Sequence, residues 1–460
     1  SGEEAAIGAY IGKGVVVEGE EEVTPGTLTI GSWTEGDTDT PSTTVPSIEG
    51  AIQGVMHEGG TFNFYDGVIK GSEDNAIRGG TSQIPTGYAV QKTTGEGVQT
   101  AILVATNYAE YNGSTFVKYY ETLEEAFEGV TSGNTIKPLK DVTDGSSADI
   151  ELAEGKTVTL DLNGYKVLTS QRIENSGTLE IKDSKTGGTY QSDTIIPIHN
   201  INSGTFTLTS GTIKKTTSTN GQTVVHNVGN SKFTMNGGTI ESQDTALGIT
   251  NIGKVTINDG HIESKDAEQG YTLYTFDESN ANVEIAGGTL IGHDTRAITS
   301  NSGTVSIKGG NIEQTGSVPA IRNYAKLMIS GGTINAAATA VENRTLTGEN
   351  AVPGETIITG GTITSGNNAI ANATGSRAEI SGGTISGEYG VMNDANSTLI
   401  VSGNSTSLTG NSSSIYNDGT VEITGGTIEG ITRHAVYNKA GTVTVSGNNT
   451  VLDGEITGIY

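Results

Sequence analysis

A short motif of two glycines, a threonine and an aliphatic residue returns along the chain at a nearly regular spacing. The aliphatic positions are separated by 27, 22, 28, 22, 22, 29 and 22 residues, so the modal period is 22. A period of this length is typical of a solenoid, in which each repeat buries its apolar side against its neighbours. The positions are Ile213, Ile240, Ile262, Leu290, Ile312, Ile334, Ile363 and Ile385.

Each period contains three short runs in which apolar and polar residues alternate, and glycine or asparagine separates the runs. Such alternation sends every second side chain inward, so the repeats predict an all-β parallel β-helix with three strands per coil of about 22 residues. The third run ends in an apolar-x-Asn triplet, and we expect its asparagines to form an internal hydrogen-bonded ladder. The triplets are Ile173–Asn175, Ile198–Asn200, Val225–Asn227, Ile249–Asn251, Ile321–Asn323, Val341–Asn343, Ile370–Asn372, Val391–Asn393, Ile415–Asn417 and Val436–Asn438.

Composition excludes several classes of protein and of site. The 460 residues include no cysteine, which excludes disulfides and thiolate metal sites, and we expect no cofactor. The formal net charge of −27 disfavours nucleic acid as a partner. The apolar stretches are far shorter than the roughly 20 residues that span a bilayer, so we expect no membrane span. No signal-peptide pattern is visible, and we expect any such segment to be missing from this sequence.

One segment has the pattern of a helix rather than a strand. Thr122 and Glu125 form a capping box, and the apolar residues Leu123, Ala126, Phe127 and Val130 follow at helical spacing. We expect this helix to cap the main solenoid, residues 115–460. Residues 1–114 are then a small N-terminal β-helical unit with a long loop at 34–46 and a linker at its end. The alternative is one unbroken solenoid with the helix inserted at its side.

The segment 120–165 resembles the entry segment of secreted right-handed β-helix proteins of the pectin-lyase-like superfold, in particular repetitive bacterial surface proteins. The matching motifs are ETLEEAF at 121–127, GNTIKPLKDVT at 133–143 and KTVTLDLNGY at 156–165. The resemblance implies a right-handed β-helix that is secreted or held at the bacterial cell surface. The superfold includes polysaccharide lyases, glycoside hydrolases and non-enzymatic adhesins, so it does not imply one activity.

No set of residues predicts catalysis. Asp244 and Asp294 occupy comparable corners of non-adjacent coils, and we interpret His293-Asp294-x-Arg296 as a solvated corner. Asp161, in the entry motif, is expected to accept hydrogen bonds in a turn. The arginines fall at different offsets within their coils and are not expected to converge, which predicts that acidic polysaccharides are not cleaved. These are Arg296, Arg322, Arg344, Arg377 and Arg433.

The middle residues of the triplets form an outward column that contains the candidate binding residues. His199 and His226 lie one coil apart and are expected to stack, but two histidines without a third ligand do not predict a metal site. Tyr416 and Tyr437 also lie one coil apart. Exposed tyrosines can contact sugar rings, or can form a purely structural ladder.

These observations predict a non-catalytic, extracellular, adhesin-like repeat protein of a bacterium, with a polysaccharide or a host or cell-surface ligand as its partner. The alternatives are a carbohydrate-active enzyme, either a polysaccharide lyase or a glycoside hydrolase, and a carbohydrate-binding β-helix without catalysis. An enzyme would have a lateral groove with convergent ionisable groups, whereas a stalk would be nearly uniform.

Overall fold

The chain forms two compact units in the computed structural model, Ser1–Gly129 and Val130–Tyr460. The ranges that the structure describes are 7–12, 26–32, 41–72, 74–85, 87–145, 148–192, 196–216, 223–243, 245–250, 253–265, 270–276, 280–346 and 352–460.

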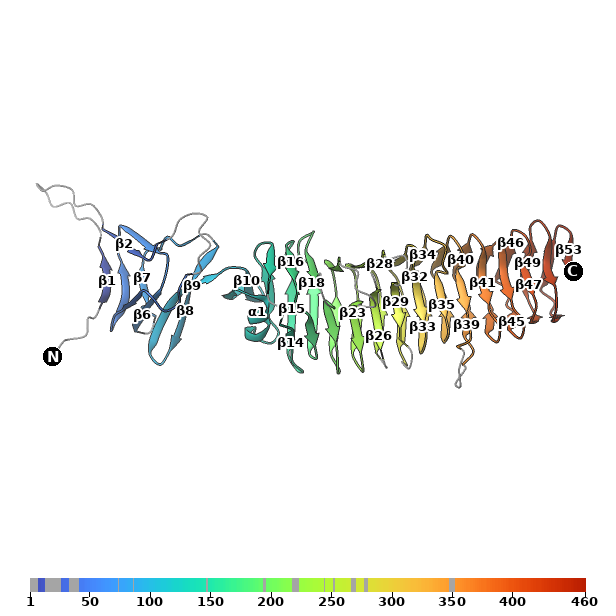
Figure 1. Cartoon of the computed structure of the whole chain (residues 1–460), viewed down its shortest axis with the longest axis horizontal. Helices are drawn as coiled ribbons and strands as arrows, with labels where there is room; N and C mark the ends of the chain where they lie inside the picture. Colours follow the sequence, from blue (N-terminus) through green and yellow to red (C-terminus); the bar gives the residue numbers. More distant parts are fainter. Residues whose placement is uncertain are drawn as a thin grey trace, which may run out of the picture. The chain divides into compact units, whose positions relative to one another are not determined.

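The second unit is a parallel β-solenoid in which successive coils stack along one axis (Figure 1). Each coil gives one strand to each of three sheets, and the predicted parallel β-helix is confirmed.

The first sheet of this unit consists of β12 (Thr135–Pro138), β15 (Thr157–Asp161), β18 (Thr178–Lys182), β21 (Thr205–Leu208), β24 (Lys232–Met235), β27 (Lys254–Ile257), β30 (Asn282–Ile285), β33 (Thr304–Ile307), β36 (Lys326–Ile329), β39 (Glu355–Ile358), β42 (Arg377–Ile380), β45 (Thr398–Val401), β48 (Thr420–Ile423) and β51 (Thr442–Val445). The second sheet consists of β13 (Val142–Asp144), β16 (Lys166–Thr169), β19 (Thr189–Ser192), β22 (Thr212–Lys215), β25 (Thr239–Ser242), β28 (His261–Ser264), β31 (Thr289–Gly292), β34 (Asn311–Gln314), β37 (Thr333–Ala336), β40 (Thr362–Ser365), β43 (Gly383–Gly387), β46 (Thr406–Gly410), β49 (Gly426–Gly430) and β52 (Thr450–Gly454). The third sheet consists of β14 (Ile150–Leu152), β17 (Ile173–Asn175), β20 (Ile198–Asn200), β23 (Thr223–Val228), β26 (Thr245–Thr250), β29 (Tyr271–Thr275), β32 (Arg296–Ser300), β35 (Ile321–Asn323), β38 (Val341–Asn343), β41 (Asn368–Asn372), β44 (Tyr389–Asn393), β47 (Ile415–Asn417), β50 (His434–Asn438) and β53 (Thr457–Ile459).

The aliphatic residues of the repeated motif form the core of the solenoid. Ile312, Ile334, Ile363 and Ile385 pair in register on successive strands of the second sheet. All four are completely buried, as are Ile240 and Ile428, so the predicted inward column is confirmed. Because the side chains alternate across each strand, one register aligns every apolar layer with the next.

The predicted asparagine ladder is also confirmed. In its longest run the side-chain amide of Asn343 donates to the Oδ1 atom of Asn372 at 2.9 Å, and Asn372 donates to Asn393 at 2.8 Å. The amides donate to backbone carbonyl oxygens as well, as Asn343 does to Gly354 at 3.0 Å. The ladder therefore satisfies polar groups at the corner between the third and first sheets.

One predicted triplet is wrong in register. Strand pairing aligns Leu247, Gly248 and Ile249 with the triplet at 225–227, two residues before the predicted position. Asn251 lies outside the described residues. The next two coils supply Leu273–Thr275 and Ile298–Ser300, which end in threonine and serine and therefore escape a search for asparagine.

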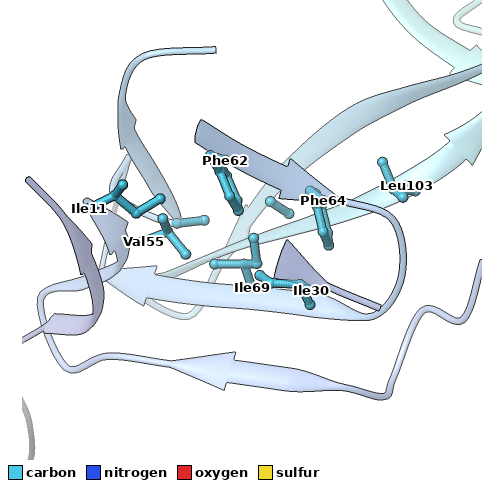
Figure 2. Close-up of a cluster of buried hydrophobic side chains, with 9 residues drawn as sticks. Ile11, Ile30, Val55, Phe62, Phe64, Ile69 and Leu103 are labelled. Carbon is cyan, nitrogen blue, oxygen red and sulfur yellow. The ribbon is translucent and has the colours of Figure 1, made fainter. Parts of the chain in front are cut away.

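The first unit contains short coils of the same kind. Its sheets are formed by β1 (Ile7–Ile11), β4 (Gln53–His57) and β7 (Ile77–Gly79), by β2 (Thr27–Ile30) and β5 (Thr61–Phe64), and by β3 (Ser47–Glu49), β6 (Val68–Ser72), β9 (Val98–Ala105) and β8 (Tyr88–Gly95). Figure 2 shows the core that they enclose, in which the rings of Phe62 and Phe64 stack 6.3 Å apart beside Val55 and Ile69. Of the predicted loop at 34–46, residues 34–40 lie outside the described residues.

The predicted helix is α1 (Leu123–Gly129), which follows the antiparallel hairpin of β10 (Tyr108–Asn112) and β11 (Thr115–Tyr120). The amide of Glu125 donates to Thr122 Oγ1 at 3.1 Å, and the Glu125 carboxylate accepts from the Thr122 amide at 3.4 Å, which confirms the capping box. Leu123, Ala126 and Phe127 are buried, and the helix packs on the hairpin. The division between the two units falls directly after α1. That α1 caps the second unit stays a prediction. Within the described ranges, no helix has the length and apolar character needed to cross a membrane.

Candidate functional site

The outer face of the third sheet has one position from each coil in a single column. Register places the column residues directly over one another, at the interstrand spacing of about 4.8 Å. From β14 to β50 they are Glu151, Glu174, His199, His226, Gly248, Tyr274, Thr299, Arg322, Glu342, Ala371, Met392, Tyr416 and Tyr437. The column has three chemically distinct parts: a histidine pair, an arginine- and tyrosine-rich part and a tyrosine stack.

The histidine pair stacks as predicted. The rings of His199 and His226 lie 5.3 Å apart with an angle of 18° between their planes. His199 Nδ1 lies 3.3 Å from a carboxylate oxygen of Glu174, and the ring of Phe276 lies 5.6 Å from His226 on the other side. Gly248 leaves room for this, since a Cβ atom there would lie 3.1 Å from Phe276. Among the described residues, no group of three or more His, Cys, Asp and Glu could hold a metal ion.

Burial, together with the neighbouring charge of His199, lowers the pKa of His226 from 6.5 to about 4. The unfolded chain therefore binds a proton at this imidazole at a higher pH than the folded chain does. The contribution of His226 to stability is complete above pH 6.5 and is lost as the pH falls towards 4, by up to about 3 kcal/mol.

We expect His226→Gln to flatten the dependence of the urea midpoint on pH within this window. His199→Gln removes only the smaller cause of the lowered His226 pKa, the neighbouring charge, and is expected to flatten this dependence in part. The interpretation is wrong if wild type and His226→Gln lose stability equally between pH 6.5 and 4.

A cavity of about 350 Å³ opens in the middle part of the column, where β29, β32 and β35 lie side by side. We call it the arginine–tyrosine pocket. It is lined by Tyr271, Tyr274, Arg296, Thr299, Asn301, Arg322, Tyr324, Arg344, Thr345 and Leu346.

The prediction that the arginines do not converge is wrong for three of them. Arg296 begins β32, Arg322 is central in β35 and Arg344 follows β38, yet all three line the arginine–tyrosine pocket. Their different offsets do not separate the guanidinium groups, because the coils stack closely and an arginine side chain is long and flexible. Arg377 and Arg433 do not line it, and Arg377 pairs with Glu379 instead.

The three arginines differ in their ionic partners. Glu342 binds two of them, with its carboxylate 2.5 Å from Arg322 Nε and 3.5 Å from Arg344 Nη1. Arg296 has no ion pair within the described part of the chain, and its guanidinium lies 6.0 Å from the centre of the Tyr271 ring. Burial and the nearby charge of Arg322 lower the pKa of Arg296.

Two polar atoms of the pocket also have no hydrogen-bond partner among the described residues. They are Nε of Arg296 and Oγ1 of Thr299, and Thr299 is only 3% exposed. A buried polar atom without a partner costs free energy, so these two atoms leave the polar lining of the pocket incompletely satisfied.

A second cavity of about 470 Å³ adjoins the pocket, with which it shares Asn301, Tyr324 and Leu346. It continues to the first sheet, where Thr304 of β33, Lys326 of β36 and Glu355 of β39 line it. The two cavities together offer a surface for a ligand longer than one ring.

The tyrosine stack lies at the last coils. The rings of Tyr416 and Tyr437 are 5.2 Å apart at 32°, and those of Tyr437 and Tyr460 are 5.3 Å apart at 5°. The predicted adjacency is therefore confirmed, but the ring of Tyr437 is flanked on both sides by other tyrosines. Neither face of the Tyr437 ring is therefore open, and the binding role of these residues stays a prediction.

The remaining candidates lie apart from the pocket. His293 Nε2 lies 2.5 Å from Glu263 Oε1 of β28, whereas Arg296 lines the pocket, so the motif at 293–296 does not form one cluster. Asp161 is buried, pairs with Lys137 at 2.9 Å and accepts a hydrogen bond from the Asn163 amide at 3.1 Å, which confirms its role in a turn. Asp244 lies outside the described residues.

Sequence reasoning missed the tyrosines of the pocket. Tyr271 and Tyr274 belong to the coil whose triplet ends in threonine, and Tyr324 directly follows a recognised triplet. The available signal was the cluster of aromatic residues at 271–276, in a chain with only 5% aromatic residues.

Comparison of the chain with protein-family models, with curated proteins and with solved structures finds no match.

Proposed function

We propose that this protein is a non-catalytic, extracellular, adhesin-like repeat protein of a bacterium, and that its arginine–tyrosine pocket binds a glycan. The observation that carries the proposal is the convergence of three tyrosines and three arginines from neighbouring coils on one cavity. The resemblance of the segment 120–165 to secreted β-helix surface proteins supports the extracellular location.

The lining of the pocket suits a sugar. A sugar ring has an apolar face that packs against tyrosine and an edge of hydroxyl groups that accepts hydrogen bonds from guanidinium and amide donors. The cavity of about 350 Å³ lies at the lower end of the range of about 300–1,000 Å³ for ligand pockets. The adjoining cavity lets a longer chain continue across the corner of the coil.

Binding without reaction is the better-supported activity. A general base must be free to take a proton, and the carboxylate of Glu342, which stands between Arg322 and Arg344, is already held by both. The alternative is a carbohydrate-active enzyme, for which the convergence of ionisable groups in this pocket is the favouring observation. Recovery of the ligand distinguishes the two.

The test is a titration of the purified chain with a panel of neutral and acidic oligosaccharides, followed by mass spectrometry of the recovered ligand. We expect saturable binding of at least one oligosaccharide, with its length and mass unchanged. Tyr271→Ala removes a ring from the pocket and is expected to weaken binding by about tenfold.

Tyr437→Ala is the matched control, since it removes a ring from the tyrosine stack. If only Tyr437→Ala lost binding, the binding site would be the tyrosine stack and not the pocket. Binding of no oligosaccharide would contradict the proposal, and shortened or unsaturated products would establish the enzyme alternative.

A further inference from the structure

The described lining of the arginine–tyrosine pocket contains basic but no acidic side chains, in a strongly acidic protein. The whole chain has 52 acidic against 25 basic residues, yet three guanidinium groups line this pocket, and the carboxylate of Glu342 pairs with two of them. Glu342 compensates part of the charge of Arg322 and Arg344. Arg296 is left without an ionic partner among the described residues, although it is partly buried.

The polar atoms around Arg296 are incompletely satisfied, and two tyrosine rings lie beside the arginines of the pocket. Arg296 Nε and Thr299 Oγ1 have no partner in the described part of the molecule, and both residues line the cavity. Tyr271 lies beside the guanidinium of Arg296, and Tyr324 lies beside that of Arg344, each with 6.0 Å between the guanidinium carbon and the ring centre. A sugar ring that carries an anion can therefore place its apolar face against a tyrosine while the anion meets a guanidinium.

We infer that the pocket selects a sugar that carries an acidic group, a carboxylate or a sulfate, and that Arg296 receives this group. The inference rests on the proposed function, since it names the class of glycan that the same pocket binds. A neutral sugar leaves the charge of Arg296 partly desolvated and unpaired, which is costly. An acidic group forms charge-assisted hydrogen bonds with the guanidinium.

The experiment compares a hexuronic acid trisaccharide with its methyl ester, in which the rings are unchanged and the charges are absent. By titration calorimetry at one fixed salt concentration, we expect the wild-type chain to bind the acid at least about tenfold more tightly than the ester. Arg296→Gln is expected to remove this preference, because it lowers the affinity for the acid and leaves the affinity for the ester unchanged. Arg296→Lys keeps the charge without the planar fork and is expected to retain part of the preference.

Arg377→Gln is the matched control, because Arg377 does not line the pocket, and it is expected to keep the full preference. Thermal unfolding of each variant establishes that it is folded. A sulfated, otherwise neutral trisaccharide and inorganic sulfate complete the panel. Preference for the sulfated sugar, for the uronate or for both supports the inference and identifies the acidic group.

Four results would overturn the inference. If the wild type bound acid and ester equally, the pocket would not select for charge. The proposed function of glycan binding would still hold. A preference that survives in folded Arg296→Gln would assign the anion to another residue. Inorganic sulfate that binds as tightly as the sulfated sugar would show an anion site without sugar recognition, and binding of no sugar at all would refute the proposed function itself.

Discussion

Replacement of Ile334 by aspartate is expected to lower the stability of the second unit by more than about 4 kcal/mol. Ile334 is completely buried on β37, between Ile312 of the preceding coil and Ile363 of the following coil. The new carboxylate would lie between two aliphatic layers without a partner. Because each coil is stabilised mainly by its neighbours, the damage should reach the adjoining coils.

Asn335→Asp is the matched control, since it places the same negative charge on the next residue of β37, which is exposed. Its expected effect is within about 0.5 kcal/mol. Urea unfolding followed by circular dichroism gives the stability of both variants, and amide hydrogen exchange gives the coils affected. Equal stability of the two variants would mean that Ile334 does not point into the core.

Replacement of Asn343 by alanine is expected to cost about 2–4 kcal/mol, the second largest effect that we predict. The Asn343 amide donates to Asn372 at 2.9 Å and to the carbonyl oxygen of Gly354 at 3.0 Å, and its Oδ1 accepts from Asn323 at 2.9 Å. Alanine would leave these buried groups of neighbouring coils without their partner.

The control for this variant is Asn335→Ala, which makes the same substitution at an exposed position one strand earlier. We expect it to change the urea midpoint little, while Asn343→Ala lowers the midpoint and increases hydrogen exchange around β38. An Asn343→Ala protein as stable as the control would show that the ladder contributes no net stability.

The coil architecture could be predicted because local and global requirements agree in this chain. Residues such as Ile334 and Asn343 recur at one place in most coils, so a search for repeats finds the core and the ladder directly. The register at Leu247–Ile249 could not be found in this way. Coil length varies there, and the alternative triplet at 249–251 matches the pattern better than the true one.

In the candidate site, only contacts between residues that lie one coil apart in the sequence could be predicted. The contacts between His199 and His226 and between Tyr416 and Tyr437 follow from that spacing. The pocket does not, because Arg296, Arg322 and Arg344 start from different offsets and meet only through the reach of their side chains. The orientation of the tyrosine rings likewise depends on packing that sequence periodicity does not specify.

A crystal structure of the chain with the hexuronic acid trisaccharide tests most directly whether the arginine–tyrosine pocket holds an acidic sugar. We predict an intact trisaccharide in the pocket, with one carboxylate within hydrogen-bonding distance of the Arg296 guanidinium and its ring against Tyr271. A trisaccharide bound only at the tyrosine stack of Tyr416 and Tyr437, or bound in the pocket with its carboxylates turned away from Arg296, would contradict the claim.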